Sequence, residues 1–266
     1  KNKYDGCYNK IQSFYIANIL FFTFVLNLKS MTYLSVNINK IATLRNARGE
    51  GLPDVVKAAV NCQLYGADGI TIHPRPDQRH ITRDDVYNLK EVITTEYNIE
   101  GYPSDDFIKL VLDIEPTQVT LVPDAKDVIT SNNGWDTVKY QSLIKDVIKE
   151  FKKKNIRTSV FVNPDIKMVE GAKLCDADRI ELYTEAYCRG YNKNRELAIS
   201  PYLEAANKAN ELKLGVNAGH DLNMNNLSYF VTSINNISEV SIGHALISDA
   251  IYLGLENTIQ MYKRLL

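Results

Sequence analysis

Short apolar stretches rich in β-branched residues alternate with helical patterns along the chain from residue 33 onward. Each stretch is followed by a polar loop and then by apolar positions that recur every three or four residues. Apolar runs of roughly four to eight residues are typical of buried strands, whereas the wider spacing is typical of helices that bury one face. Eight strands are therefore predicted, over residues 33–39, 69–73, 98–102, 118–123, 157–163, 179–184, 214–218 and 239–244.

Helix start signals lie between these strands. Pro53 stands where a first helical residue would, and Thr82 with Asp85 three residues later predicts a capping box. Ser104 is followed by two aspartates, which suit the positive end of a helix dipole. Two further helices are predicted, over 201–213 after the cap and first turn at Ser200-Pro201 and over 249–266.

Strands that alternate with helices form a parallel sheet, because parallel strands need a crossover connection. Eight units of about 25–30 residues favour a closed barrel over an open doubly wound sheet. No linker or low-complexity stretch interrupts residues 31–266. We therefore expect one α/β domain over residues 31–266, a (β/α)8 TIM barrel with a parallel eight-stranded core.

Residues 1–30 do not follow this pattern. They contain an apolar run from Phe14 to Leu28 that follows three lysines. A signal peptide has a similar basic start and apolar middle, but no small-residue cleavage site follows here, and a membrane span needs about 20 residues. We expect Met31 to be the true start and residues 1–30 to be upstream translated sequence or an artefact, with a signal or anchor as the alternative. No membrane contact is expected for 31–266.

Composition and charge narrow the class of protein. The 266 residues are 45% hydrophobic and 24% charged, which excludes disorder, collagen and coiled coil as overall descriptions. The net charge of −1 lacks the basic excess of a nucleic-acid-binding protein, so no nucleic acid partner is expected. The four cysteines show neither a C-x-x-C spacing nor a disulfide framework. Free thiols of this kind are typical of a reducing, cytoplasmic location.

Candidate chemistry collects at the carboxyl ends of the predicted strands, where barrels of this class place their active sites. The four histidines of the chain all fall there: His73, His80, His220 and His244. A lone histidine on a strand is more often structural than catalytic, but four at one end of a barrel favour a functional role. Histidine gives or takes a proton near neutral pH, which carbonyl chemistry requires.

Two carboxylates occupy similar positions. Glu100 and Glu181 follow apolar strand residues at inward-facing or strand-end positions. A structural ion pair with a neighbouring cation is one interpretation of each. A carboxylate at such a position is costly unless it is paired or used in catalysis, so we favour a functional role for both.

Arginines in two loops indicate phosphate binding. Arg45 and Arg48 lie in one segment, and Arg75 and Arg79 lie in the next beside two histidines. Arginine clusters bind phosphate through paired hydrogen bonds, so two clusters predict two phosphorylated groups, with solvated loops as the alternative. Gly243 leads from the last strand into a helix, whose free N–H groups suit a further phosphate contact.

Several motifs are absent. The chain has no H-E-x-x-H and no clustered Cys/His site, so no metal is predicted. It has neither a P-loop nor a G-x-G-x-x-G fingerprint, which leaves nucleotide and nicotinamide chemistry unsupported. No cofactor is expected.

Five segments closely resemble the pyridoxine 5′-phosphate synthase family, which closes the ring in vitamin B6 synthesis. The resemblance extends from residue 33 to about 266, and its first and fourth segments are long and specific. The segments are 36–49 (VNINKIATLRNARG), 66–73 (GADGITIH), 79–82 (RHIT), 216–220 (VNAGH) and 241–245 (SIGHA).

This resemblance implies a (β/α)8 barrel that condenses 3-amino-2-oxopropyl phosphate with 1-deoxy-D-xylulose 5-phosphate. The products are pyridoxine 5′-phosphate, phosphate and water. It also implies a homo-oligomer, an octamer in the family.

By motif, His73 and Glu100 would be bases, His220 a general acid, and Glu181 a group that stabilises charge in the intermediates. Asn37, Arg48, Gly243 and His244 would hold the amino-ketone phosphate, and Arg75, His80 and Thr130 the deoxyxylulose phosphate, with Thr130 on a closing loop over 124–136.

Three positions depart from the pattern of the better-known members. Asn39-Lys40 replaces Asp-His, so Asn39 is expected to contact a sugar hydroxyl without carrying charge. Asp221 stands where many members have glycine. An aspartate can serve there if the position binds substrate through its backbone N–H, whereas a carboxylate is unfavourable if the position needs a positive φ or a close approach to a phosphate. Residues 183–188 also differ, beside Glu181.

Two other functions remain as alternatives. One is a different phosphate-binding barrel enzyme, a sugar-phosphate isomerase or an aldolase. A Schiff-base aldolase needs a lysine deep in the barrel, and Lys40 is the one candidate at a strand end. The other is a non-catalytic module that binds phosphorylated metabolites. Such a module would need Arg48 and Arg75 but not His73, Glu100 and His220 together.

Overall fold

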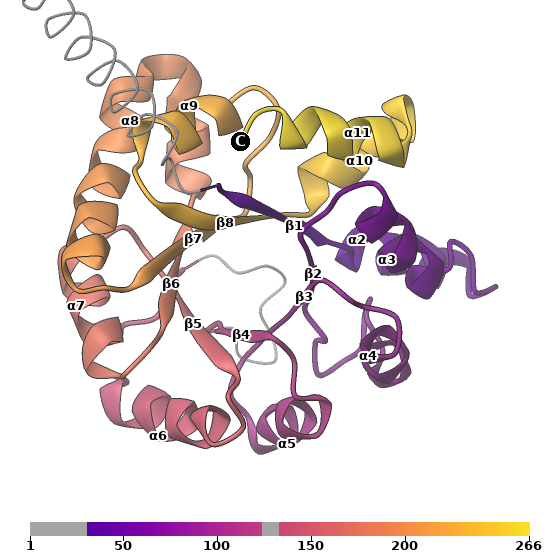
Figure 1. Cartoon of the computed structure of the whole chain (residues 1–266), viewed down its shortest axis with the longest axis horizontal. Coiled ribbons are helices and arrows are strands. Elements are labelled where there is room, and N and C mark those ends of the chain that lie inside the picture. Colours follow the sequence, from indigo (N-terminus) through magenta and orange to yellow (C-terminus); the bar gives the residue numbers. More distant parts are fainter. Residues whose placement is uncertain (1–30, 124–132) are drawn as a thin grey trace, which may run out of the picture. The chain divides into compact units, whose positions relative to one another are not determined.

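In the computed structural model, which describes residues 31–123 and 133–266, eight parallel strands close into a barrel in chain order (Figure 1). Each strand pairs with its sequence neighbours, and β1 also pairs with β8. The predicted (β/α)8 barrel is therefore confirmed. The strands are β1 Tyr33–Asn37, β2 Gly69–Ile72, β3 Glu96–Gly101, β4 Gln118–Leu121, β5 Arg157–Val162, β6 Arg179–Tyr183, β7 Gly215–Gly219 and β8 Ile237–Ile242.

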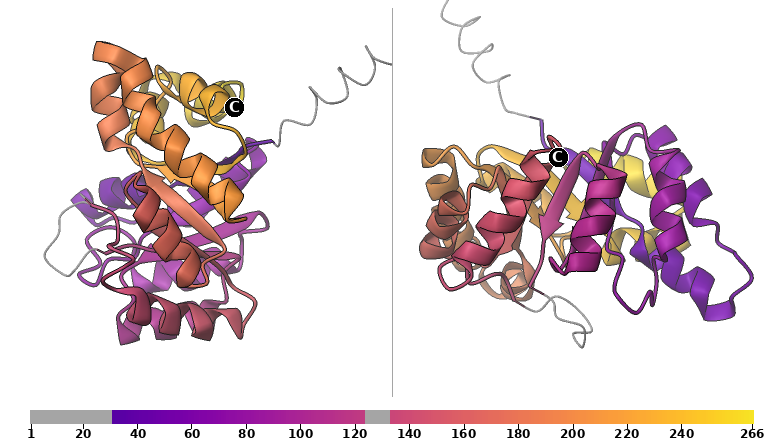
Figure 2. Two further views of the ribbon diagram at one scale, coloured as in Figure 1. Left: turned by 90° about the vertical axis from the view of Figure 1, so that its left-hand side faces the viewer. Right: turned by 90° about the horizontal axis from the view of Figure 1, so that it is seen from below.

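Helices surround the barrel, and Figure 2 shows them on the outside of the strands. Buried apolar side chains fill the layer between strands and helices, as Leu34 and Ile70 of the strands and Phe151 of α6 do. No helix among the described residues is both long and apolar enough to span a bilayer. The helices are α2 Asn39–Arg48, α3 Val55–Leu64, α4 Arg83–Lys90, α5 Asp105–Ile114, α6 Gln141–Lys152, α7 Ile166–Leu174, α8 Glu185–Glu211, α9 Leu227–Ser233, α10 His244–Leu253 and α11 Leu255–Lys263.

Two of the three predicted helix starts are confirmed. Thr82 accepts from the backbone of Asp85, and the Asp85 carboxylate accepts from the Thr82 amide, which completes the capping box of α4. Ser104 caps α5 by accepting from the amide of Phe107. The first turn of α3 differs, because Asp54 is its N-cap and Pro53 precedes the helix instead of starting it.

Two predicted helix boundaries are wrong. The segment after β6 is helical from Glu185 to Glu211 with one break at Asn194, whose side chain accepts from the amide of Leu197. Asn194 therefore starts the second half, and Pro201 lies inside the helix. The segment predicted as one closing helix over 249–266 forms α10 and α11, because Gly254 breaks it with a φ of 78°.

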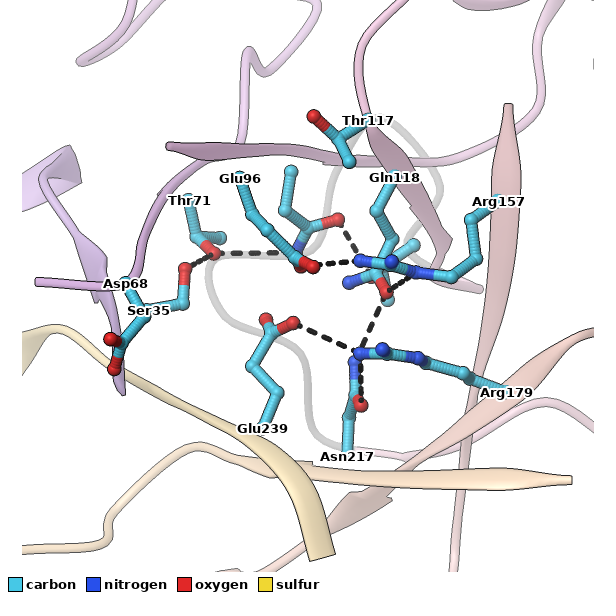
Figure 3. A network of polar contacts seen from close by, with 12 residues as sticks. Ser35, Asp68, Thr71, Glu96, Thr117, Gln118, Arg157, Arg179, Asn217 and Glu239 are labelled. Carbon is cyan, nitrogen blue, oxygen red and sulfur yellow. Dashed lines mark hydrogen bonds and ion pairs between the residues drawn. The ribbon is translucent and has the colours of Figure 1, made fainter. Parts of the chain in front are cut away.

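The interior of the barrel is polar, which the apolar strand patterns do not indicate. At the amino ends of the strands, Arg157 pairs with Glu96, and Arg179 Nη1 lies 3.3 Å from Glu239 Oε2. Gln118 links the two pairs, since it accepts from Arg157 Nε at 2.9 Å and from Asn217 at 3.4 Å. Figure 3 shows these side chains converging on one another inside the barrel. The charged pairs therefore lie at the opposite end of the strands from the predicted site.

Candidate active site

A cavity of about 860 Å³ opens at the carboxyl ends of the strands. It is lined by residues at or just beyond the ends of all eight strands and by the first turn of α8, and its size suits one or two small phosphorylated molecules. Most of the predicted site residues line it: Asn37, Asn39, His73, Arg75, His80, Glu100, Glu181, His220, Asp221, Gly243 and His244. The four histidines predicted to meet at one end of the barrel therefore do so.

His73 and Glu100 form one wall of the cavity. His73 follows β2 and Glu100 lies near the end of β3, so pairing of the two strands brings their side chains together. His73 Nδ1 is 3.7 Å from Glu100 Oε2, and both side chains are largely buried. Burial lowers the pKa of His73 well below its usual value, and the nearby charges of Arg75, His80 and Arg79 lower it further. The imidazole is therefore neutral at pH 7 and able to accept a proton.

Arg75 and His80 lie beside this pair, in the loop after β2. Arg75 is buried, unlike most arginines in loops. Burial, reinforced by the charges of Arg75 and Lys40, lowers the pKa of His80 to about 4. His80 Nδ1 accepts from the amide of Ile81 at 3.0 Å. The neutral ring therefore carries its proton on Nε2 and acts as a hydrogen-bond donor there.

Glu181 lies in the floor of the cavity with 3% of its surface exposed. Burial raises the pKa of this carboxyl well above its usual range, and the charges of Glu100 and Glu239 add to the effect. Among the described residues, its Oε2 has no hydrogen-bond partner. A buried carboxyl with a raised pKa that lines a cavity is suited to donate a hydrogen bond to an oxygen of a ligand.

His220 lies across the cavity, immediately after β7. Its φ of 74° is left-handed, which is uncommon for a residue other than glycine. Thr184 holds this backbone by donating to the carbonyls of Gly219 at 2.6 Å and of His220 at 3.1 Å. The Tyr183 ring and the imidazole lie nearly perpendicular to each other, with centroids 5.0 Å apart. A backbone conformation fixed so firmly points to a functional demand on this side chain.

The partner of His220 is Asp221. The His220 Nδ1 atom is 3.1 Å from Asp221 Oδ2, within ion-pair range, although its N–H is not aligned well enough to count as a hydrogen bond. Burial opposes the charged form of the imidazole, but the carboxylates of Asp221, Glu100 and Glu185 together outweigh it and raise the pKa of His220, with Asp221 contributing most. His73 and His220 thus have opposite shifts, one towards the neutral form and one towards the cation.

The end of β1 and the start of α10 form a second wall. Asn37 Oδ1 accepts from the amide of Asn39, and Asn39 Oδ1 accepts from the amide of His73 at 3.0 Å, so Asn39 bridges β1 and β2. Gly243 is the N-cap of α10, and a Cβ there would lie about 3.1 Å from Asn37 Cβ. This close approach leaves the first amides of α10 facing the cavity rim, where an anion binds favourably.

The loop predicted over 43–49 is wrong, because residues 39–48 form α2. Arg45 turns away from the cavity and pairs with Asp85 through both its Nη atoms. Arg48 ends α2 with 79% of its side chain exposed and lies 3.1 Å from Glu50, outside the cavity lining. The structure therefore does not bring Arg48 together with the other site residues.

The structure places the remaining predicted residues as follows. Thr130 and most of the predicted closing loop lie outside the described residues. Lys40 is exposed on the first turn of α2 at the cavity rim, and not deep in the barrel as a Schiff-base lysine would be. Within 31–123 and 133–266, no three His, Cys, Asp or Glu side chains are grouped as a metal site. Cys62, Cys175 and Cys188 are free thiols, and Cys7 lies outside the described residues.

Sequence reasoning missed three residues around His220. Thr184 supports its backbone, Tyr183 contacts its ring, and Arg189 lines the cavity from α8 while pairing with Glu185 at 2.5 Å. A hydroxyl at the end of a strand is a weak signal for Thr184. No sequence pattern indicates that Arg189 reaches the cavity, because this depends on where α8 begins.

Comparisons with known proteins agree with this geometry. The family model described as "Pyridoxal phosphate biosynthesis protein PdxJ" matches residues 34–266. The chain is 60% identical over 234 residues to the pyridoxine 5′-phosphate synthase of Cytophaga hutchinsonii, covering 88% of this chain and 98% of that one. It is 60% identical over 236 residues to that of Bacteroides thetaiotaomicron, covering 89% and 100%.

Solved structures add evidence on the fold alone. A chain of tryptophan synthase from M. tuberculosis superposes with a TM-score of 0.59 at 10% identity, covering 89% of this chain and 92% of that one. Phosphoribosylanthranilate isomerase from Thermotoga maritima gives 0.55 at 12% identity, covering 88% and 98%. Identities this low show a shared barrel and carry no information on the reaction.

Proposed function

The chain belongs to the family of the pyridoxal phosphate biosynthesis protein PdxJ, and from this membership we propose how its cavity performs the pyridoxine 5′-phosphate synthase reaction. The substrates are 3-amino-2-oxopropyl phosphate and 1-deoxy-D-xylulose 5-phosphate, and the products are pyridoxine 5′-phosphate, phosphate and water. The observation that carries the proposal is the pair of oppositely tuned histidines, His73 and His220, on two sides of one cavity.

The reaction joins an amine to a ketone, expels phosphate, and closes and aromatises a ring. Each of these steps moves a proton, so one group must accept protons while another supplies them at the same pH. Two groups with pKa values displaced in opposite directions meet this requirement. A single cavity that holds both substrates also converts a bimolecular encounter into a near-unimolecular one.

His73 and Glu100 act as the bases in this proposal. The neutral imidazole of His73 takes a proton from a carbon or nitrogen of the joined substrates, and Glu100 acts as a second base beside it. Their separation of 3.7 Å supports such a pairing, because a small movement brings the two groups into hydrogen-bond contact.

His220 is the general acid. It donates a proton to an oxygen that leaves as water. Glu181 remains protonated at neutral pH and donates a hydrogen bond to an oxygen that gains negative charge in an intermediate. The burial of Glu181 and its unpartnered Oε2 support this role.

The two phosphates are bound on different walls. Arg75 and the Nε2–H of His80 bind the deoxyxylulose phosphate, together with Thr130, which lies outside the described residues. Asn37, Gly243 and His244 bind the amino-ketone phosphate at the start of α10, with Arg48 recruited from the end of α2. Asn39 contacts a sugar hydroxyl, and the backbone of Asp221 contacts substrate.

We further propose that the protein works in the cytoplasm as a homo-oligomer, an octamer by family resemblance. Exposed apolar side chains on neighbouring helices support self-association, since large apolar residues rarely cluster on the surface of a monomer. Ile251 and Tyr252 of α10 are 72% and 87% exposed, and Leu44 of the adjoining α2 is 57% exposed. Light scattering of the purified protein measures the oligomeric state.

Residues 31–266 constitute the catalytic domain in this proposal, and residues 1–30 take no part in the reaction. The described barrel supports this, because Thr32–Leu266 forms one compact unit whose first strand starts at Tyr33. Deletion of residues 1–30 should leave both solubility and turnover unchanged. An insoluble or inactive truncated chain would contradict it.

Product formation tests the activity directly. The purified chain is incubated with both substrates, and pyridoxine 5′-phosphate and inorganic phosphate are quantified by chromatography and a phosphate assay. We expect equal amounts of the two products and none when either substrate is omitted. An isomerase or aldolase would instead consume one substrate alone, and borohydride would trap a Schiff base on Lys40. A His73→Asn/His220→Asn double variant is the control for contaminating enzyme.

A further inference from the structure

His220 does not stand alone in the cavity, because the residue after it carries a carboxylate that reaches its ring. Asp221 Oδ2 lies 3.1 Å from His220 Nδ1. We infer that Asp221 is a positioning residue that keeps His220 in its protonated form and directs the Nε2–H of the ring into the cavity. This inference rests on the proposed function, in which His220 is the general acid.

The local backbone makes this contact possible. In extended chain, the side chains of successive residues point to opposite sides. The left-handed φ of 74° at His220 breaks this alternation and brings the two side chains together. Asp221 is itself fixed, because its carbonyl accepts from the side-chain amides of Asn223 at 3.1 Å and Asn226 at 3.5 Å. The backbone that carries the ion pair is therefore held by hydrogen bonds on both sides of it.

Charged and titratable groups from three other elements also face this ring. Glu100 of β3 and Glu185 at the start of α8 both favour the charged imidazole. The ring of Tyr183 of β6 lies nearly perpendicular to that of His220, while its hydroxyl donates to Glu185 at 2.7 Å. Arg189 of α8 carries a positive charge, in contrast to the two carboxylates, but it is paired with Glu185. Of these groups, only Asp221 lies close enough to Nδ1 to set the orientation of the ring.

A carboxylate on Nδ1 has a chemical consequence for Nε2. A carboxylate 3.1 Å from Nδ1 favours a proton on that nitrogen in either charge state of the ring, so the proton that leaves is the one on Nε2. The ring then passes from imidazolium to the neutral Nδ1–H form and is recharged from solvent. A residue without a side-chain carboxylate at position 221 would leave both nitrogens free to lose the proton, and would lower the fraction of the charged form at neutral pH.

Titration of His220 tests the pairing without any turnover. Histidine labelled with ¹³C at Cε1 is incorporated into the full-length protein, and the His220 signal is identified by its loss in His220→Asn. Asparagine suits this position because it tolerates a left-handed φ. In Asp221→Asn we expect the His220 titration to move to lower pH. Asp221→Glu should restore most of the shift, and Asp84→Asn, an exposed change on α4, should leave it unchanged.

Steady-state kinetics of the same variants test the consequence. Asp221→Asn should lower kcat about tenfold on the basic side of the pH profile and less on the acidic side, with the basic limb moving to lower pH. KM for each substrate should change less than about twofold, because the side chain acts through His220.

The outcomes separate the two proposals. A His220 titration that does not move in Asp221→Asn overturns the positioning role, as does a rise in KM with kcat and the pH profile unchanged. A titration that moves while the basic limb of turnover stays in place supports the pairing but overturns the role of His220 as general acid.

Discussion

Glu181 and Gly219 face each other across neighbouring strands at the floor of the cavity. A Cβ at residue 219 would come much closer than 3.0 Å to Glu181 Oε1, nearer than real Cβ atoms approach other atoms. The strand pairing aligns Glu181 with Asn217 and Tyr183 with Gly219, which places the carboxyl over the glycine. The side chain of Glu181 on the neighbouring strand β6 therefore favours glycine at this position, because the backbone of Gly219 is that of a regular strand.

Gly219→Ala should displace the Glu181 carboxyl and impair catalysis while the barrel still folds. Overpacking of a buried site costs about 1–3 kcal/mol of unfolding free energy, measured by denaturant titration. In a Glu181→Ala background the same alanine should cost much less, because the atom it collides with is gone. An equal cost in both backgrounds would mean that the two residues are not coupled.

The protonation state of Glu181 predicts which substitutions it tolerates. In the proposed mechanism the carboxyl is protonated at pH 7, and glutamine then reproduces its shape, charge and hydrogen-bond donor. Glu181→Gln should therefore lower kcat less than about tenfold, whereas Glu181→Ala should lower it about 10²–10³-fold. Steady-state measurement of kcat for both variants tests this difference. If Glu181→Gln is as damaged as Glu181→Ala, the residue acts as a charged carboxylate.

His73→Asn and Glu100→Gln should each lower kcat about 10²–10⁴-fold with little change in KM, since each removes a proton acceptor. The lowered pKa of His73 adds a prediction about pH. The base must be deprotonated to act, so the acid limb of the kcat profile should lie below the usual histidine value of about 6.5. An acid limb at or above that value would exclude His73 as the base. Lys90→Gln, a change on α4 outside the cavity, is the control.

Most of this site could be predicted from the sequence because a parallel barrel brings all strand ends together. The apolar runs locate the ends, and polar residues such as His73, Glu100 and His220 follow them. The pattern does not specify which way a side chain turns after the strand ends. Arg45 therefore looked like a phosphate ligand, although its position on α2 directs it to Asp85.

The role of Asp221 was hidden for a similar reason. Neighbours in sequence usually point apart, and only the left-handed turn at His220 brings them into contact. The polar barrel interior was also hidden, although Glu96 lies just before one predicted strand and Arg157 and Arg179 begin two others. Their mutual pairing depends on closure of the barrel, which joins residues far apart in the chain.

The two phosphate sites should respond differently to loss of an arginine. Arg75→Ala should raise KM for the deoxyxylulose phosphate about tenfold to a hundredfold, the effect of losing about 1.5–3 kcal/mol of charge-assisted hydrogen bonding. Arg48→Ala should weaken the amino-ketone phosphate by a smaller factor, because its exposed guanidinium must first leave Glu50. Separate KM values for each substrate test this. Equal effects of one variant on both substrates would refute two distinct phosphate sites.

The network at the amino end of the barrel predicts how stability depends on pH. Burial raises the pKa of Glu239 to about 7, despite the opposing charge of Arg179. A carboxyl whose pKa is higher in the folded than in the unfolded chain stabilises the fold at low pH. It loses that contribution as pH rises from about 4.5 to about 7. Glu239→Gln should therefore flatten the decline in unfolding free energy across this window, measured by urea titration at a series of pH values.

Glu256→Gln, a surface change at the start of α11, should preserve the decline. If stability in Glu239→Gln still declines as in the parent protein, the carboxyl is not the titrating group, and the ion pair with Arg179 in Figure 3 holds it ionised throughout.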